Sequence, residues 1–188
     1  LHEMQEVYRL RLDHAKRAAR ELLERDGDPD VVRPARRQAI AALRRLDLAH
    51  LNAVRRVHAA FEAEVVPLER PAVRDAIADV RRIVDHAGTV FVAGGHVAVL
   101  LNRLRLLGGE WLLSGKPVVA WSAGAMVMCE AVVLFHDQPP QGASHAEVFD
   151  AGLGLVRNIM VFPHSQTRLK LHDATRVALL ARRFAPAA

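Results

Sequence analysis

The chain has 188 residues, enough for one sizeable domain or two small ones, and 51% of them are hydrophobic, which argues against general disorder. The formal net charge of +5 comes mostly from arginine, which is interleaved with Glu and Asp at helical spacing in the first half. This pattern indicates solvated helix faces before it indicates a nucleic-acid footprint. No apolar run is long enough to cross a bilayer. The single cysteine, Cys129, excludes an intrachain disulfide and fits a reducing, cytoplasmic setting.

Residues 1–86 are predicted to form a helical region, because apolar residues recur at intervals of three and four with charged residues between them. The expected helices run from residue 2 to 25, from Pro29 to about Leu46, from Asp47 to Pro67 and from near Pro71 to Gly88. Asp28 and Asp47 are interpreted as helix caps, since a short acidic side chain accepts hydrogen bonds from the first backbone N–H groups.

Short β-branched runs alternate with helical patterns after Thr89, which predicts an α/β layered region with a parallel sheet over residues 87–188. Strands are expected at 89–93, 117–121 and 159–162, with a further strand at 131–135, and helices at about 97–107, 123–129 and 167–183. Residues 138–144, rich in Pro and Gly, are expected to form a loop.

The stretch from Val118 to Met126 has the layout of a strand, a sharp turn and a helix, with Ser122 at the turn. Such a turn lifts a hydroxyl off the end of a sheet and directs backbone N–H groups toward whatever the serine attacks. Ala123 and Gly124 are small enough to fit a crowded turn. The alternative is a buried strand and helix in which Ser122 is only the N-cap.

Two other polar or flexible positions also follow predicted strands: the pair Gly94-Gly95 and His164. Sites in parallel sheets lie at the carboxyl ends of the strands, so these residues and Ser122 are expected at one edge. A serine hydroxyl needs a neutral imidazole within hydrogen-bond reach, and His164 is the best candidate for that base. The alternative is that His164 is an ordinary loop histidine.

Taken together, Ala93-Gly94-Gly95, then a Leu-rich helix, then Trp121-Ser122-Ala123-Gly124-Ala125, then Phe162-Pro163-His164 resemble the peptidase E and cyanophycinase group of serine peptidases, peptidase family S51. That group belongs to the class I glutamine amidotransferase-like superfamily. The resemblance covers about residues 85 to 175 and implies a three-layer, flavodoxin-like α/β fold with a mostly parallel sheet. It implies a serine-type peptidase that cleaves amide bonds in small peptides.

The resemblance places the nucleophile at Ser122 and the base at His164, with Asp137 as the acid that orients the histidine. Glu130 is the alternative acid, although its place two turns into the helix gives it a poor reach to His164. The N–H groups of Gly95 and Ala123 would form the oxyanion hole. The substrate-binding positions are His96, Trp121 and Arg168. No metal and no cofactor are expected.

The chain departs from the family pattern at two positions: Ala120 stands where the family usually has Gly, and His96 where it usually has Asn, Asp or Gln. The early strands of the family are also not visible, since helices occupy that space. Either the chain lacks its N-terminal strands, which Leu1 as the first residue favours, or the helical region is an elaboration of this branch of the family. The first alternative predicts an incomplete domain, in which one edge of the sheet is unpaired or covered by a partner.

Two functions therefore remain open from the sequence. The first is a serine hydrolase acting on a small peptide by a Ser-His-Asp or Ser-His-Glu triad. The second is a non-catalytic scaffold whose Arg-rich helices bind a partner or nucleic acid. The expected partner is a small peptide substrate, without a membrane and with nucleic acid disfavoured, and a homodimer stays open.

Overall fold

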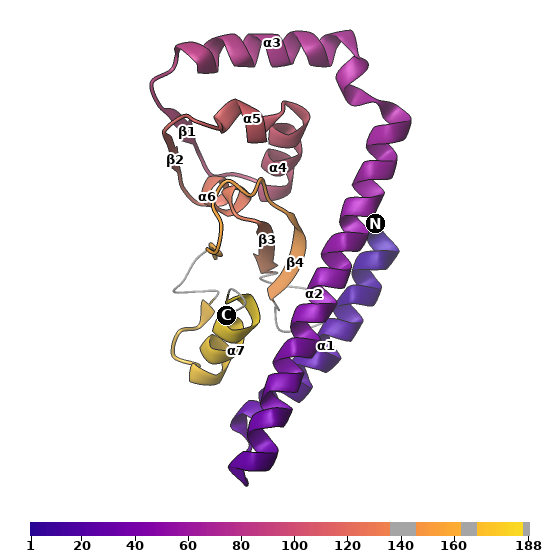
Figure 1. Ribbon diagram of the computed structural model, residues 1–188, viewed down its shortest axis with the longest axis vertical. Coiled ribbons are helices and arrows are strands. Elements are labelled where there is room, and N and C mark those ends of the chain that lie inside the picture. The colour runs from indigo at the N-terminus through magenta and orange to yellow at the C-terminus, as the bar shows by residue number, and fades with distance from the viewer. Residues whose placement is uncertain (136–145, 163–168, 186–188) are drawn as a thin grey trace. The chain divides into compact units, whose positions relative to one another are not determined.

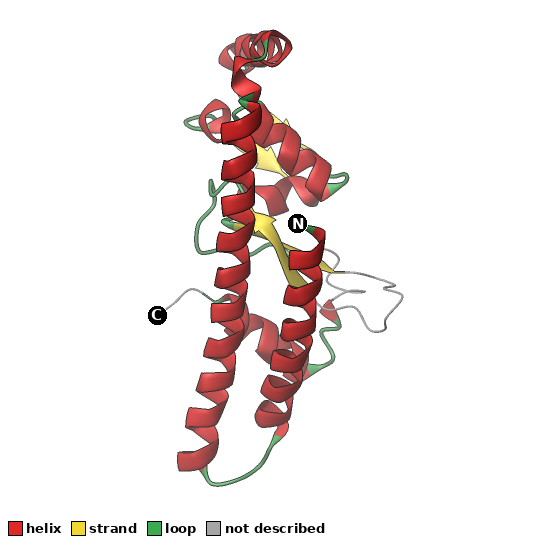
Figure 2. Ribbon diagram, turned by 90° about the vertical axis from the view of Figure 1, so that its right-hand side faces the viewer, coloured by secondary structure: helices red, strands yellow, loops and turns green. Residues whose placement is uncertain are grey.

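The computed structural model describes residues 1–135, 146–162 and 169–185 (Figure 1). The elements in chain order are α1 (His2–Glu24), α2 (Pro29–Val65), the short 3-10 helix η1 (Pro67–Glu69), α3 (Pro71–His86), β1 (Val90–Val92), α4 (Val97–Leu106), α5 (Gly109–Leu113), β2 (Val118–Ala120), α6 (Ala123–Met128), β3 (Ala131–Phe135), β4 (Ala146–Ala151) and α7 (Ala174–Phe184). The chain thus combines a helical N-terminal region with short strands and further helices, as the sequence predicts (Figure 2).

The chain divides into two compact units. The first contains residues Leu1–Val54, Val133–Phe149 and Phe162–Ala188, and the second contains Arg55–Val132 and Asp150–Val161. Helix α2 and strands β3 and β4 each contribute residues to both units. No helix in the described part of the chain is long and apolar enough to span a membrane.

The predicted helix boundary at Asp47 is wrong, because α2 runs unbroken from Pro29 to Val65. Asp47 is buried inside this helix, where its carboxylate accepts a hydrogen bond from the Tyr8 hydroxyl at 2.8 Å. Arg183 of α7 donates two further bonds to Asp47, both at 2.6 Å. The carboxylate therefore joins α1, α2 and α7 of the first unit, instead of capping a helix.

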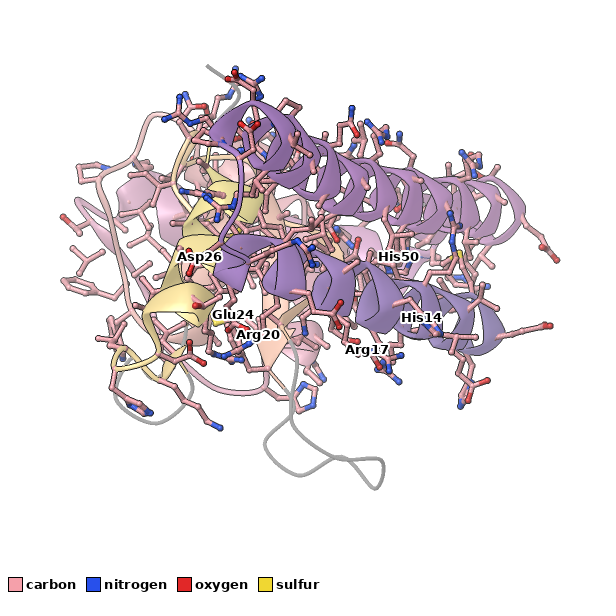
Figure 3. The ribbon with its side chains drawn as sticks, turned by 90° about the horizontal axis from the view of Figure 1, so that it is seen from below. His14, Arg17, Arg20, Glu24, Asp26 and His50 are labelled. Atoms are coloured by element: carbon pink, nitrogen blue, oxygen red, sulfur yellow. The ribbon has the colours of Figure 1, made fainter. Side chains whose placement is uncertain are left out.

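Polar side chains follow one another along the outer face of α1, including His14, Arg17, Arg20 and Glu24 (Figure 3). Arg20 pairs with Glu24 at 2.9 Å, one turn along the helix, and with Asp173 at 3.1 Å. The opposite face of α1 is apolar and buries Tyr8, Leu12 and Ala19. The alternation of apolar and charged residues that predicted α1 is thus the alternation of its buried and solvated faces.

In the second unit, β1 and β2 form a two-stranded parallel sheet in which Val90, Phe91 and Val92 pair with Val118, Val119 and Ala120. Val92 is buried, whereas Phe91 and Val119, paired on the opposite face, are 66% and 48% exposed. Strands β3 and β4 pair in a separate two-stranded sheet. No other strand of the described residues pairs with β1 or β2.

The expected strand at 159–162 is not formed as a regular strand. Asn158, with φ 60°, turns the chain immediately before residue 159. Pro163, which has no backbone N–H, follows residue 162 in the sequence. Only four residues remain between these two breaks, which is short for a hydrogen-bonded ladder. The final helix begins at Ala174, where the Asp173 side chain accepts the N–H of Arg176 at 2.9 Å.

Candidate active site

Ser122 lies between the end of β2 and the start of α6 in a backbone conformation that L-residues rarely adopt, with φ 54° and ψ −128°. Non-glycine residues in such sparsely populated regions cost about 1–3 kcal/mol each and persist only where the surrounding structure holds them. Ser122 is exposed, and the residues that follow it in α6 are largely buried. The chain therefore exposes the Ser122 hydroxyl at a strained turn, and the helix that follows this turn is packed in the protein interior.

The strained turn is held by backbone hydrogen bonds on both sides. The N–H of Trp121 donates to the carbonyl of Val92 at 3.2 Å, which continues the β1–β2 ladder up to the turn. The N–H of Gly124 then donates to the carbonyl of Trp121 at 3.0 Å. The Ser122 carbonyl accepts the N–H of Met126 at 3.1 Å, as the first bond of α6. These bonds fix the direction in which Ser122 leaves the sheet.

Two glycines allow the close packing around the turn. A Cβ added to Gly94, at the end of β1, would lie 2.9 Å from both Cβ and Oγ of Ser122. A Cβ added to Gly124 would overlap the carbonyl oxygen of Val92. Because either methyl group would displace backbone or the serine itself, only glycine fits at both positions. The sequence pattern points to the Gly94-Gly95 pair but does not reveal that Gly94 contacts the serine.

The other predicted site residues of the second unit lie on the same loops. Gly95 is exposed, has φ 142° and has open space around it. His96 caps α4, where its Nδ1 accepts the N–H of Val99 at 3.4 Å. Trp121 is 50% exposed beside the serine, and Ala123 is buried at the first position of α6. Glycine at position 95 leaves its backbone N–H unobstructed by a side chain.

A cavity of about 590 Å³ lies beside β2. Val118 and Ala120 of β2 line it together with Ile159 and Val161, so the segment 159–161 lies near this strand although it forms no ladder. Cys129 also borders the cavity, and burial raises the pKa of its thiol. A buried cysteine with a raised pKa is a poor nucleophile.

His164, Asp137 and Arg168 lie outside the described residues, so their predicted roles stay predictions. Glu130, the alternative acid, is exposed beyond the end of α6, where its Oε2 accepts the N–H of Asn158 at 3.1 Å. Among the described residues, no group of three or more His, Cys, Asp and Glu side chains could hold a metal ion.

The second unit also contains a buried carboxylate that was not predicted from the sequence. Asp150 is 3% exposed and accepts two hydrogen bonds from Arg105, at 2.7 and 3.0 Å. The His58 ring lies 3.0 Å from the same carboxylate. This cluster borders a polar cavity of about 440 Å³. The sequence signal is an acidic residue inside a short run that also contains Glu147, and it does not reveal the partners of Asp150.

Comparison with known proteins gives one match. No curated protein and no solved structure matches the chain. The profile of peptidase family S51 matches residues 41–184, which is most of the chain and includes the turn at Ser122. The chain belongs to peptidase family S51.

Proposed function

We propose that this protein is a serine-type peptidase that cleaves amide bonds in small peptides, with Ser122 as nucleophile, His164 as base and Asp137 as the orienting acid. The observation that carries the proposal is the conformation of Ser122, φ 54° and ψ −128°, at the junction of a parallel strand and a helix. A serine that served only as a helix N-cap would adopt an ordinary extended backbone and would bond an N–H of the first turn. The Ser122 side chain makes no such capping bond.

The proposed reaction follows the chemistry of serine hydrolases. Ser122 Oγ attacks the carbonyl carbon of the scissile amide while His164 accepts the hydroxyl proton. The same histidine then protonates the leaving amine, which gives an acyl-enzyme, and water hydrolyses this ester by the reverse proton transfers. Asp137 holds the imidazole in the required tautomer and stabilises its protonated form. Glu130 remains the alternative for this position.

Backbone geometry supports the proposed oxyanion hole. The N–H groups of Gly95 and Ala123 belong to loops that meet at the serine, since Gly94 is packed against Ser122 and Ala123 follows it directly. Donors placed where negative charge develops supply a large part of catalysis in acyl transfer. The 142° φ value of Gly95 is open to glycine but strained for other residues, which supports a requirement for this backbone direction.

The position of residues 159–161 supports the proposed role of His164. Ile159 and Val161 line the cavity beside β2, and β2 is the strand that leads into Ser122. Only Phe162 and Pro163 separate Val161 from His164 in the sequence, and His164 itself lies outside the described residues. His96, Trp121 and Arg168 are the proposed substrate contacts. The proposal includes the three-layer fold of the superfamily and a cytoplasmic location.

The test is the turnover of a panel of dipeptides, including Asp-containing ones, by the wild type, Ser122→Ala and His164→Ala. A fluorophosphonate probe reports the nucleophile independently of substrate choice. The matched control is Ser114→Ala, because Ser114 is an exposed serine of the same unit. Ser122→Ala and His164→Ala should each lower turnover by roughly a thousandfold or more, since triad members act as a unit.

The labelling result decides between the two functions left open by the sequence. Probe incorporation that is lost in Ser122→Ala and kept in Ser114→Ala supports the hydrolase. Equal labelling or equal residual turnover in the wild type and Ser122→Ala would reject it in favour of a non-catalytic scaffold.

A further inference from the structure

A cleft of about 730 Å³ in the first unit is lined by five arginines and by no acidic residue. It lies between α2 and the C-terminal end of α7, and its lining residues are Arg33, Arg36, Arg37, Ile40, Ala41, Arg44, Arg182 and Ala185. We call this surface the arginine cleft. Five positive charges without a carboxylate among them repel one another, and this repulsion is relieved when an anion binds.

Two of the five guanidinium groups are fixed by backbone carbonyls. Arg36 donates through Nε to the carbonyl of Leu22 at 2.8 Å and through Nη2 to that of Arg25 at 2.7 Å. Arg44 donates through Nε and Nη2 to the carbonyl of Arg182, at 3.0 and 2.5 Å. A guanidinium carries five N–H donors, so each of these two arginines keeps donors that these bonds do not use. Both side chains are thus held in place with donors to spare, which lowers the entropy lost on binding.

The other three arginines, Arg33, Arg37 and Arg182, are exposed, and no carboxylate of the described residues pairs with them. Some arginines elsewhere in this unit are paired with carboxylates. Arg20, on the outer face of α1 (Figure 3), pairs with Glu24 and Asp173, and Arg9 pairs with Glu147 at 2.7 Å. Exposed arginines without a carboxylate partner among the described residues also occur elsewhere in this unit, as at Arg11 and Arg45, so the cleft is distinguished by the gathering of five arginines around one hollow.

The spacing of the arginines suits an extended chain. Arg33, Arg37 and Arg44 lie along one side of α2, with separations of about 6 and 10 Å along the helix axis at 1.5 Å per residue. Alternate side chains of an extended peptide are separated by about 7 Å. Carboxylates on alternate residues can therefore meet the guanidinium groups of Arg33 and Arg37, which bind carboxylates with two parallel hydrogen bonds. Ile40, Ala41 and Ala185 provide apolar contacts for the stems of these side chains.

We propose that the arginine cleft binds an acidic peptide segment in extended conformation. A single-stranded nucleic acid is the other extended polyanion, but sites for it add aromatic side chains on which the bases stack. None of the residues that line the cleft is aromatic. The partner is therefore identified by its carboxylates, and the binding is independent of Ser122 chemistry.

The experiment titrates the full chain into a fluorescein-labelled peptide of alternating glutamate and alanine, and follows anisotropy at two salt concentrations. A peptide of alternating glutamine and alanine controls for charge, and labelled oligothymidylate represents nucleic acid. The test variant is Arg33→Gln with Arg37→Gln. Its matched control is Arg56→Gln with Arg74→Gln, two exposed arginines of the second unit whose loss changes the net charge equally.

The cleft variant should bind the acidic peptide about tenfold or more weakly than the wild type, and the control variant within about twofold, because charge-assisted bidentate bonds contribute directly. The glutamine peptide should not bind. Absence of binding to the acidic peptide, or equal losses in both variants, would overturn the proposal. Oligothymidylate that binds more tightly than the peptide and is lost only in the cleft variant would assign the cleft to nucleic acid instead.

Discussion

Gly94 lies directly against Ser122: a Cβ at position 94 would be 2.9 Å from both Cβ and Oγ of the serine. The two residues are 28 positions apart and are brought together because the parallel strands β1 and β2 end at the same edge of their sheet. Gly94 thus allows close packing against Ser122, whereas Gly95 allows a backbone conformation, with φ 142°, that is strained for other residues. The contact connects the fold of the second unit to the position of the proposed nucleophile.

Gly94→Ala should therefore impair the nucleophile without unfolding the protein. The added methyl group must displace the Ser122 side chain, and small misplacements of a reacting atom cost about a hundredfold in rate. We expect fluorophosphonate labelling at least about tenfold slower than in the wild type. Gly88→Ala is the control, because a Cβ at Gly88 meets no atom within 4 Å. Labelling of Gly94→Ala at the wild-type rate would show that the contact does not position the hydroxyl.

The backbone strain at Ser122 predicts a difference between two inactive variants. Ser122→Ala removes the hydroxyl but keeps a side chain at φ 54° and ψ −128°, whereas Ser122→Gly removes both the hydroxyl and the strain. Ser122→Gly should be more stable than Ser122→Ala by about 1 kcal/mol, even though glycine normally destabilises through the entropy of the unfolded chain. Denaturant unfolding of the two variants measures this difference. A lower midpoint for Ser122→Gly would mean that the turn stores no strain.

How far the sequence predicts this fold depends on whether a pattern is local. The helices of the first 86 residues and the strands β1 and β2 follow from periodicity and from β-branched runs, and the structure confirms both. The continuity of α2 through Asp47 does not follow, because the partners of this carboxylate, Tyr8 and Arg183, are 39 and 136 positions away.

Strand β4 was not predicted from the sequence for the same reason, since it depends on partners far away along the chain. Glu147 and Asp150 interrupt its apolar pattern, and both are buried only because Arg9 pairs with Glu147 and Arg105 with Asp150. At the candidate site, the sequence locates the turn at Ser122 from its neighbours. The packing of Gly94 on the serine depends on the register of β1 and β2, which no local pattern contains.

The buried pair of Asp47 and Arg183 should be strongly coupled. Arg183 is 3% exposed and donates to both oxygens of Asp47, to the Tyr8 hydroxyl at 3.1 Å and to the carbonyl of Ala146 at 2.8 Å. Either Asp47→Leu or Arg183→Met leaves an uncompensated buried charge and should cost about 3–5 kcal/mol of unfolding free energy.

The double variant, Asp47→Leu with Arg183→Met, should recover much of this loss, because no buried charge then remains. A double-mutant cycle by denaturant unfolding measures the coupling. Additive losses in the double variant would contradict the prediction, since they would mean that the two side chains do not interact.

Lys16 should make the stability of the protein depend on pH above neutrality. Its Nζ is buried, with no hydrogen-bond partner among the described residues. Burial, and then the charge of Arg183, lower the pKa of this amine from its ordinary value of 10.5 to about 7. Between these two pH values the unfolded chain holds a proton that the folded chain has released. Stability therefore increases with pH across this range, and the full cost of the buried charge is present below about pH 7.

Lys16→Met removes the charge and keeps the apolar stem, so it should be more stable than the wild type at pH 6, by about 1–2 kcal/mol. This advantage should shrink as the pH rises toward 10, because the wild-type amine is then neutral in the folded state. Arg11→Met, at an exposed position of the same helix, is the control and should show no pH-dependent difference. Unfolding free energies at pH 6, 8 and 10 provide the measurement. A difference between Lys16→Met and the wild type that stays constant over this range would show that Lys16 does not titrate there.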